Sequence, residues 1–253
     1  MTVRHPWSRY VAIGDSFTEG IGDPEPANPG GHRGWADRVA EVLASQVENF
    51  AYANLAIRGR LLQQILDEQV DAALALRPDL ISISAGGNDI IRPGTDPDEV
   101  AARLDSGIER LRRDDATVVM FNGPDIGSTP VLGRMRGKVA IYNENLHAIA
   151  KRHDAIVADM WATRELTDSR MWAPDRLHFS PVGHQAIARM VLDALNVAND
   201  LEPFAAEPLT RQTWRQARID DIGWAREHFA PWILRRLRRE SSGDGVTPKR
   251  PEF

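Results

Sequence analysis

Residues 10–20 read YVAIGDSFTEG, and this stretch decides the fold. Its first four residues form a short apolar run typical of a buried strand. The Gly, Asp and Ser that follow are typical of a turn between a strand and a helix. Similar short runs predict further strands at 47–53, 80–84, 117–121 and 155–159.

Helical patterns separate these runs, at residues 35–44, 61–76, 97–111, 138–152 and 181–197. The alternation predicts an α/β fold: a three-layer α/β/α sandwich around a five-stranded parallel sheet. We expect a flavodoxin-like strand order, because right-handed crossovers leave few other arrangements. Residues 1–200 are predicted to form the catalytic domain. Residues 201–253 are predicted to add a linker, an amphipathic helix over 211–239 and a disordered tail from residue 241.

Composition narrows the classes of function. The chain has 253 residues, a formal net charge of −5 and no cysteine. Disulfides, thiolate metal sites and a cysteine nucleophile are therefore excluded. The mild acidity argues against nucleic-acid binding. We find no signal-peptide pattern and no apolar run long enough to span a bilayer, so a soluble, cytoplasmic protein is expected. The oligomeric state stays open.

Two polar groups predict nucleophilic catalysis. Ser16 follows the first strand, at the sheet edge where ligands bind in open α/β folds. Asp175 and His178 are separated by two residues, so one tight turn can present both to the same cleft. A serine hydroxyl needs a base such as histidine, and a carboxylate holds the imidazole in one tautomer. Taken singly, Ser16 could be a helix N-cap, and the Asp/His pair could be a surface pair.

Two further turns follow other strands. Asn88 lies in Gly86-Gly87-Asn88-Asp89 and offers an amide donor to an oxyanion. Gly59 follows the second strand and could bring a backbone N–H close to a substrate. Each motif alone fits an ordinary turn. Their positions past different strands, in one chain, are what a converging site requires.

With these motifs the chain resembles the SGNH (GDSL-type) hydrolases over roughly residues 9–197. GDSFTEG, the stretch 54–59, GGND and the stretch 175–178 match four family blocks in order. The resemblance implies Ser16 as nucleophile, Asp175 and His178 as acid and base, and Ser16, Gly59 and Asn88 as the oxyanion hole. It implies no metal or other cofactor and the hydrolysis of esters or thioesters, with short-chain or acetyl esters our expectation for this chain.

The chain departs from the family pattern at Arg58, where a small residue commonly precedes the glycine. Position alone makes three arginines candidate contacts for a small ester substrate: Arg58, Arg60 and Arg92. His184 is the one rival base, and we expect it to be either a supporting residue behind the site or a surface residue. The nucleophile elbow Gly-x-Ser-x-Gly is absent around Ser16, so the larger α/β-hydrolase fold is not assigned.

Two other functions remain alternatives. A metal-dependent phosphoesterase could use hard ligands from a polar set, namely Asp15, Asn88, Asp89, Asp175 and His178. An interaction module could instead use the C-terminal helix, whose apolar stripe and basic run at 235–239 could bind anionic lipid or a partner. The apolar stripe is also what a helix packed on the catalytic domain would show.

Overall fold

The computed structural model describes residues 5–112, 115–127, 129, 132–205, 223–224, 227 and 241–253. Within these residues a sheet of five parallel strands has the order β2-β1-β3-β4-β5. The strands are β1 (Arg9–Gly14), β2 (Ala51–Asn54), β3 (Leu80–Ser84), β4 (Thr117–Phe121) and β5 (Ile156–Ala158). The predicted parallel sheet and its flavodoxin-like order are confirmed.

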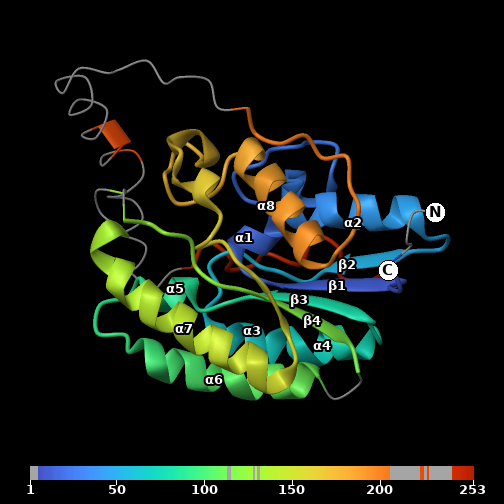
Figure 1. The fold of residues 1–253 in the computed structure, drawn as a ribbon, viewed down its shortest axis with the longest axis horizontal. Coiled ribbons are helices and arrows are strands. Elements are labelled where there is room, and N and C mark those ends of the chain that lie inside the picture. Colours follow the sequence, from blue (N-terminus) through green and yellow to red (C-terminus); the bar gives the residue numbers. More distant parts are fainter. Residues whose placement is uncertain are drawn as a thin grey trace.

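The sheet lies between two helical layers (Figure 1). One layer contains α2 (Gly34–Gln46) and α8 (Pro181–Ala194), and the other contains α3 (Leu62–Glu68), α4 (Val70–Ala75), α6 (Pro97–Leu111) and α7 (Arg136–His153). Each layer has its own apolar core because side chains alternate along a strand. In β1, Val11 and Ile13 join the α3–α7 core, whereas Tyr10 and Ala12 join the α2–α8 core. The predicted three-layer sandwich is confirmed.

The helix predicted over 61–76 is divided in two at Gln69. This buried side chain leaves the helical surface to bond the main chain of Gly14 at the end of β1. Its Oε1 accepts the Gly14 N–H at 2.7 Å, and its Nε2 donates to the Gly14 carbonyl at 2.9 Å. The division between α3 and α4 therefore serves the strand end that carries the GDS turn.

Two short helices that follow strands were not predicted from the sequence. They are α1 (Ser16–Glu19) after β1 and α5 (Gly87–Ile90) after β3, which lie beyond the same end of the sheet (Figure 1). The described residues also form four 3-10 turns, at Pro29–Gly31, Leu132–Met135, Arg164–Thr167 and Ser169–Met171. None of the described helices is both long and apolar enough to cross a bilayer.

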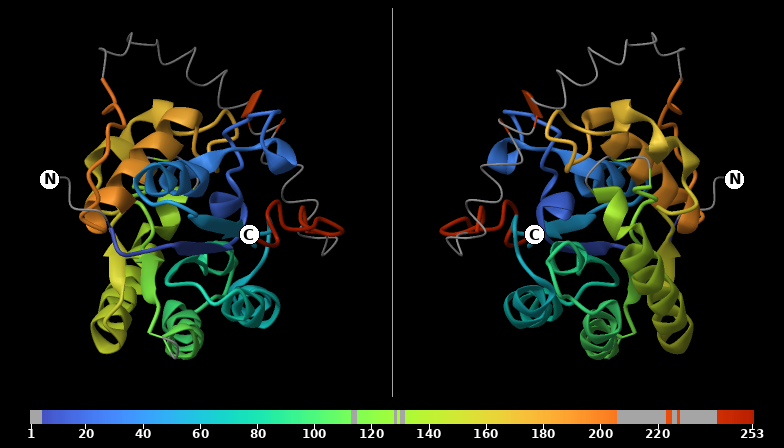
Figure 2. Two further views of the ribbon diagram at one scale, coloured as in Figure 1. Left: turned by 90° about the vertical axis from the view of Figure 1, so that its right-hand side faces the viewer. Right: turned by 90° about the vertical axis from the view of Figure 1, so that its left-hand side faces the viewer.

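The tail predicted to be disordered packs instead against the α/β sandwich. Residues 241–253, here called the C-terminal segment, run along the β2 edge of the sheet (Figure 2). Arg250 forms an antiparallel bridge with Asn54 at the end of β2. These main-chain bonds and the buried side chain of Lys249 hold the C-terminal segment against the sheet, although its composition predicts disorder. Of the helix predicted over 211–239, only residues 223, 224 and 227 lie within the described chain.

Candidate active site

Ser16 is presented by a tight turn between β1 and α1. Gly14 has φ +152°, and a side chain there would overlap the Ser84 carbonyl oxygen on the neighbouring strand. Asp15 then caps α1, because its Oδ1 accepts the Phe17 N–H at 3.1 Å. The turn places the Ser16 hydroxyl at the C-terminal end of the sheet, where the sequence predicted it.

The Asp175 and His178 side chains meet in a closed loop, residues 173–178, here called the His178 loop. Its ends are joined by an Ala173 N–H bond to the His178 carbonyl at 2.8 Å. Asp175 Oδ1 accepts the backbone N–H groups of Leu177 and His178, each at 3.0 Å. Asp175 Oδ2 lies 2.6 Å from His178 Nδ1, so this ring nitrogen carries the proton and donates.

The other imidazole nitrogen faces the serine. His178 Nε2 lies 3.1 Å from Ser16 Oγ, within proton-transfer reach. Burial alone would raise the pKa of Asp175, but the hydrogen bond and charge of His178 and two backbone N–H bonds hold it well below its usual range. Asp175 is thus a carboxylate able to stabilise an imidazolium. The structure brings together the three residues predicted as the triad.

Of the predicted oxyanion donors, Asn88 is hydrogen-bonded to the turns that carry the other two. Among the described residues, no protein acceptor takes the N–H of Ser16 or of Gly59, so both can serve a ligand. Gly59 needs the left-handed conformation it adopts, φ +75°. The Asn88 amide donates to Asp15 Oδ2 at 3.0 Å and to the Arg60 carbonyl at 3.1 Å. Asn88 is thus oriented by both neighbouring turns and must share a proton to serve an oxyanion.

Comparison with known proteins decides the family. The profile of the GDSL-like Lipase/Acylhydrolase family matches residues 12–186, most of the chain and all the residues just described. The chain belongs to this family. It is therefore an acylhydrolase, an enzyme of the esterase type.

Individual relatives of this acylhydrolase are distant. The "Uncharacterized protein YpmR" of Bacillus subtilis (strain 168) is 32% identical over 88 residues, which is 32% of each chain. Among solved structures, an acetylxylan esterase from Geobacillus stearothermophilus, Axe2, is 20% identical with TM-score 0.62, covering 78% of this chain and 98% of Axe2. TesA is 20% identical with TM-score 0.62, over 74% and 97%. At this identity the two structures support the fold.

Arg58, where the acylhydrolase departs from the family pattern, joins two of the site's turns. Its Nε donates to Glu19 Oε1 at 2.9 Å, and its backbone N–H donates to Glu19 Oε2 at 2.7 Å. Glu19 is buried at the end of α1. Arg60 is paired with Glu68 at 2.8 Å, and Arg92 is exposed. Arg58 and Arg60 are thus committed to internal ion pairs, and substrate contact by any of the three arginines stays a prediction.

His184 is not placed to act as a base. It is fully buried, its Nδ1 accepts the Trp35 N–H at 3.2 Å, and its Nε2 lies 3.1 Å from the Ile21 carbonyl, to which it donates. Burial lowers its pKa to about 4, so the ring is neutral. It stacks near Phe17, which follows the nucleophile. Of the two roles expected for His184, that of a supporting residue agrees with this position, whereas that of a surface residue is wrong because the side chain is fully buried.

The ligand set of the phosphoesterase alternative is not assembled for a metal. Both oxygens of Asp175 are occupied by His178 and backbone N–H groups, and Asp89 Oδ2 accepts the Leu62 N–H at 2.9 Å. In the described part of the chain, no group of three His, Asp or Glu side chains could hold a metal ion.

Trp224, which the sequence did not single out, contacts the His178 loop. Its indole N–H donates to the Asp175 carbonyl at 2.8 Å, and the Arg176 guanidinium lies 5.3 Å from the ring centre. Arg176 adopts φ +55° in this turn. No local pattern could reveal this contact, since it joins positions 49 residues apart.

Proposed function

We propose that this acylhydrolase cleaves short-chain carboxylic esters, acetyl esters above all, through an acyl-enzyme on Ser16. The observation that carries the proposal is the approach of Ser16 Oγ to His178 Nε2, 3.1 Å, with Asp175 on the opposite side of the ring. This arrangement activates a serine hydroxyl as nucleophile.

The chemistry follows from the positions of the atoms. His178 Nε2 takes the Ser16 proton as Oγ attacks the acyl carbon. The N–H groups of Ser16 and Gly59, with the Asn88 amide, stabilise the oxyanion. The intermediate collapses, His178 protonates the departing alcohol, and the acyl group stays on Ser16. Water then attacks the acyl carbon and gives a proton to His178. When this second intermediate collapses, the bond between Ser16 Oγ and the acyl carbon breaks, His178 returns the proton to Ser16 Oγ, and the carboxylic acid leaves.

Two observations favour a short acyl group. The surroundings of Gly59 are polar, because the hydroxyl groups of Ser241 and Ser242 lie against it. A long alkyl chain would gain little from such a surface. Axe2, whose fold this chain shares, is an acetylxylan esterase.

The test is hydrolysis of p-nitrophenyl acetate, butyrate and octanoate by the wild type and by Ser16→Ala. We expect the wild type to have its highest kcat/KM with the acetate ester. We expect Ser16→Ala to retain on the order of 10⁻⁴ or less of the wild-type activity, because the serine and its base act as a unit. Ser45→Ala, on the exposed face of α2, is the matched control.

A fluorophosphonate probe supplies an independent readout. Mass mapping should place the adduct on the peptide containing Ser16, and Ser16→Ala should not be labelled. Undiminished turnover by Ser16→Ala would end the proposal. A kcat/KM that rises from acetate to octanoate would overturn the short-chain assignment and leave the acyl-enzyme intact.

A further inference from the structure

The C-terminal segment is bonded to the turn that carries Gly59. Asn54, at the start of that turn, donates its N–H to the Arg250 carbonyl at 2.8 Å and accepts the Arg250 N–H at 3.3 Å. The two residues thus exchange both main-chain bonds, as in an antiparallel sheet. Residues 54–60 are here called the Gly59 loop.

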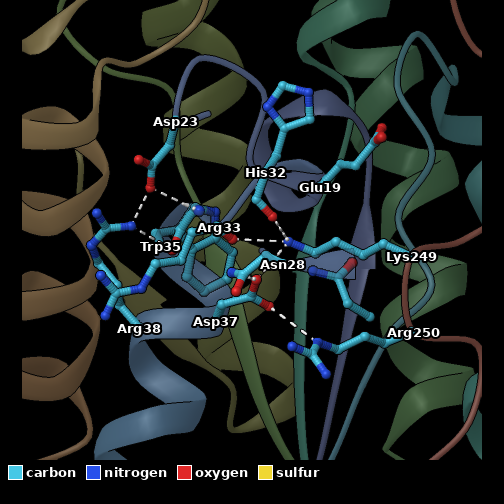
Figure 3. A network of polar contacts seen from close by, with 12 residues as sticks. Glu19, Asp23, Asn28, His32, Arg33, Trp35, Asp37, Arg38, Lys249 and Arg250 are labelled. Atoms are coloured by element: carbon cyan, nitrogen blue, oxygen red, sulfur yellow. Dashed lines mark hydrogen bonds and ion pairs between the residues drawn. The ribbon is translucent and has the colours of Figure 1, made fainter. Parts of the chain in front are cut away.

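Lys249 anchors the segment beside this bridge (Figure 3). Its side chain is only 2% exposed, and its ammonium group donates to Asp37 Oδ2 at 2.8 Å and to the carbonyls of Arg33 at 2.8 Å and His32 at 3.1 Å. All three N–H donors are therefore satisfied. The Asp37 side chain is itself 3% exposed, so neither charge has water as an alternative partner.

The segment also touches the Gly59 loop directly. Gly243 packs so closely that a Cβ there would overlap the Arg58 carbonyl oxygen and lie 2.9 Å from Ile57 Cγ2. At Gly59 itself, an added Cβ would lie 2.5 Å from Ser241 Oγ and 2.9 Å from Ser242 Oγ. One face of the loop therefore rests on residues 241–243.

From the loop, contacts continue to the nucleophile. The buried Asn54 side chain donates to the Thr18 carbonyl in α1 at 2.9 Å, and its Oδ1 accepts the Ala56 N–H at 3.1 Å. Arg58 reaches the same helix through Glu19. The Gly59 loop is thus fixed to α1 on one side and to the C-terminal segment on the other.

We propose that the C-terminal segment is a positioning element of the active site, which holds the Gly59 N–H at the oxyanion through the Asn54–Arg250 bridge and the packing of residues 241–243. Lys249 is the anchor that keeps the segment in place. This inference rests on the proposed function. A segment that only covered the β2 edge would leave the chemical step unchanged when displaced, whereas a positioning element would alter it.

The first variant is Gly243→Ala in the full-length enzyme, because its methyl group pushes the segment away from the Arg58 carbonyl and leaves every charge in place. We expect kcat for p-nitrophenyl acetate to fall about 10- to 100-fold with KM nearly unchanged, since a small misplacement of a catalytic group has an effect of this size. Thr247→Ala, exposed in the same segment, is the matched control and should behave as wild type.

The second variant, Lys249→Met, removes the anchor. The buried Asp37 carboxylate is then left with the more distant Asn28 amide, at 3.2 Å, and Arg250 guanidinium, at 3.8 Å. The variant is paired with Lys249→Met/Asp37→Asn, which removes both charges and so separates release of the segment from the cost of a buried carboxylate that has lost its lysine. We expect both to show the kcat loss, and the double variant to recover thermal stability without recovering kcat.

Three outcomes would overturn the proposal: wild-type kcat in Gly243→Ala, a loss that matches the fall in folded protein, or a double variant that regains kcat together with stability. Fluorophosphonate labelling keeps this failure apart from failure of the proposed function. If wild-type protein is labelled on Ser16 while the Gly243 and Lys249 variants have normal turnover, only the positioning role of the C-terminal segment is wrong. If Ser16 is not labelled at all, the acyl-enzyme itself fails.

Discussion

The Asn88 amide has two N–H groups, and the protein supplies an acceptor for each. Asp15 takes one and the Arg60 carbonyl takes the other. Burial raises the pKa of Asp15 to about 6, although the Phe17 N–H, His178 and the Asn88 amide oppose this. Near neutral pH the carboxyl is therefore mainly ionised and orients Asn88. An oxyanion on the substrate competes with the Arg60 carbonyl, a weaker acceptor than a charged oxygen.

Replacing Asn88 tests its role as a donor. We expect Asn88→Ala to lower kcat for p-nitrophenyl acetate by about 10²–10³-fold with little change in KM, because the contact strengthens only as charge develops on the acyl oxygen. Steady-state kinetics give both parameters. Asn145→Ala is the control: this amide on α7 also has two acceptors, Asp98 and Ile141, but lies away from the site. A variant that raised KM alone would contradict oxyanion binding.

At the scale of elements, the α3–α4 division depends on one side chain. Gln69 supplies the acceptor for the buried Gly14 N–H, whereas the Gly14 carbonyl also accepts the Ile57 N–H at 3.3 Å. We expect Gln69→Ala to lower the free energy of unfolding by about 1–3 kcal/mol, the cost of a buried donor left unpaired. Urea denaturation measures this.

A comparable glutamine separates this effect from a change in helix propensity. Gln63→Ala, on the exposed face of α3, should change the unfolding free energy by less than about 0.5 kcal/mol. If both variants unfolded at the same urea concentration, the Gln69–Gly14 clamp would contribute nothing to stability.

The sequence predicted β3, β4 and α6 with the observed bounds, because their hydrophobic periodicity is local and long enough to read. It missed α1 and α5, which have one turn each and no periodicity. It also merged α3 with α4, since the apolar stripe continues past Gln69 and the polar bond that interrupts it joins positions 55 residues apart. The local hydrophobic pattern was thus enough to predict the bounds of these long elements. It failed where a contact with a residue distant in the sequence determines where a helix ends.

At the scale of the whole molecule, buried His184 couples stability to pH. Its pKa is about 4 when folded, mainly because of burial, against 6.5 for an unburied histidine. Between these values the unfolded chain binds a proton that the folded chain does not, so this group makes stability fall as pH drops from about 6.5 to 4. Asp15 acts oppositely: its pKa rises from 3.8 to about 6 on folding, so it favours the folded state at lower pH.

The two contributions can be separated with His184→Gln, whose amide can replace both hydrogen bonds but does not titrate. We expect the stability difference between wild type and variant to change by roughly 3 kcal/mol between pH 6.5 and 4, to the disadvantage of the wild type. Thermal or urea unfolding at a series of pH values measures it. His147→Gln, exposed on α7, is the matched control for the substitution itself. If the difference in stability between wild type and His184→Gln did not change with pH, the folded ring would take up its proton over the same pH range as the unfolded one.

The residues of the candidate site that lie in short motifs could be predicted from the sequence. Ser16, Asp175, His178, Gly59 and Asn88 were each visible in a turn, and the sheet brings those turns to one edge. The contacts of Trp224 and Lys249 could not be predicted. The sequence around a tryptophan or a lysine in a polar stretch does not indicate which distant residue it will contact. The role of the basic run at 235–239 stays a prediction, as does the division of the chain at residue 200.

The Asn54–Arg250 bridge joins the second strand to a residue almost two hundred positions later. While the chain is being made, the strands and helices of the sheet can assemble as they leave the ribosome. The Gly59 loop would still lack one of its supports at that stage. A nascent polypeptide of this kind would be folded before it was fully active, and hydrolysis would reach its full rate only after position 250 had been added and had paired with the second strand.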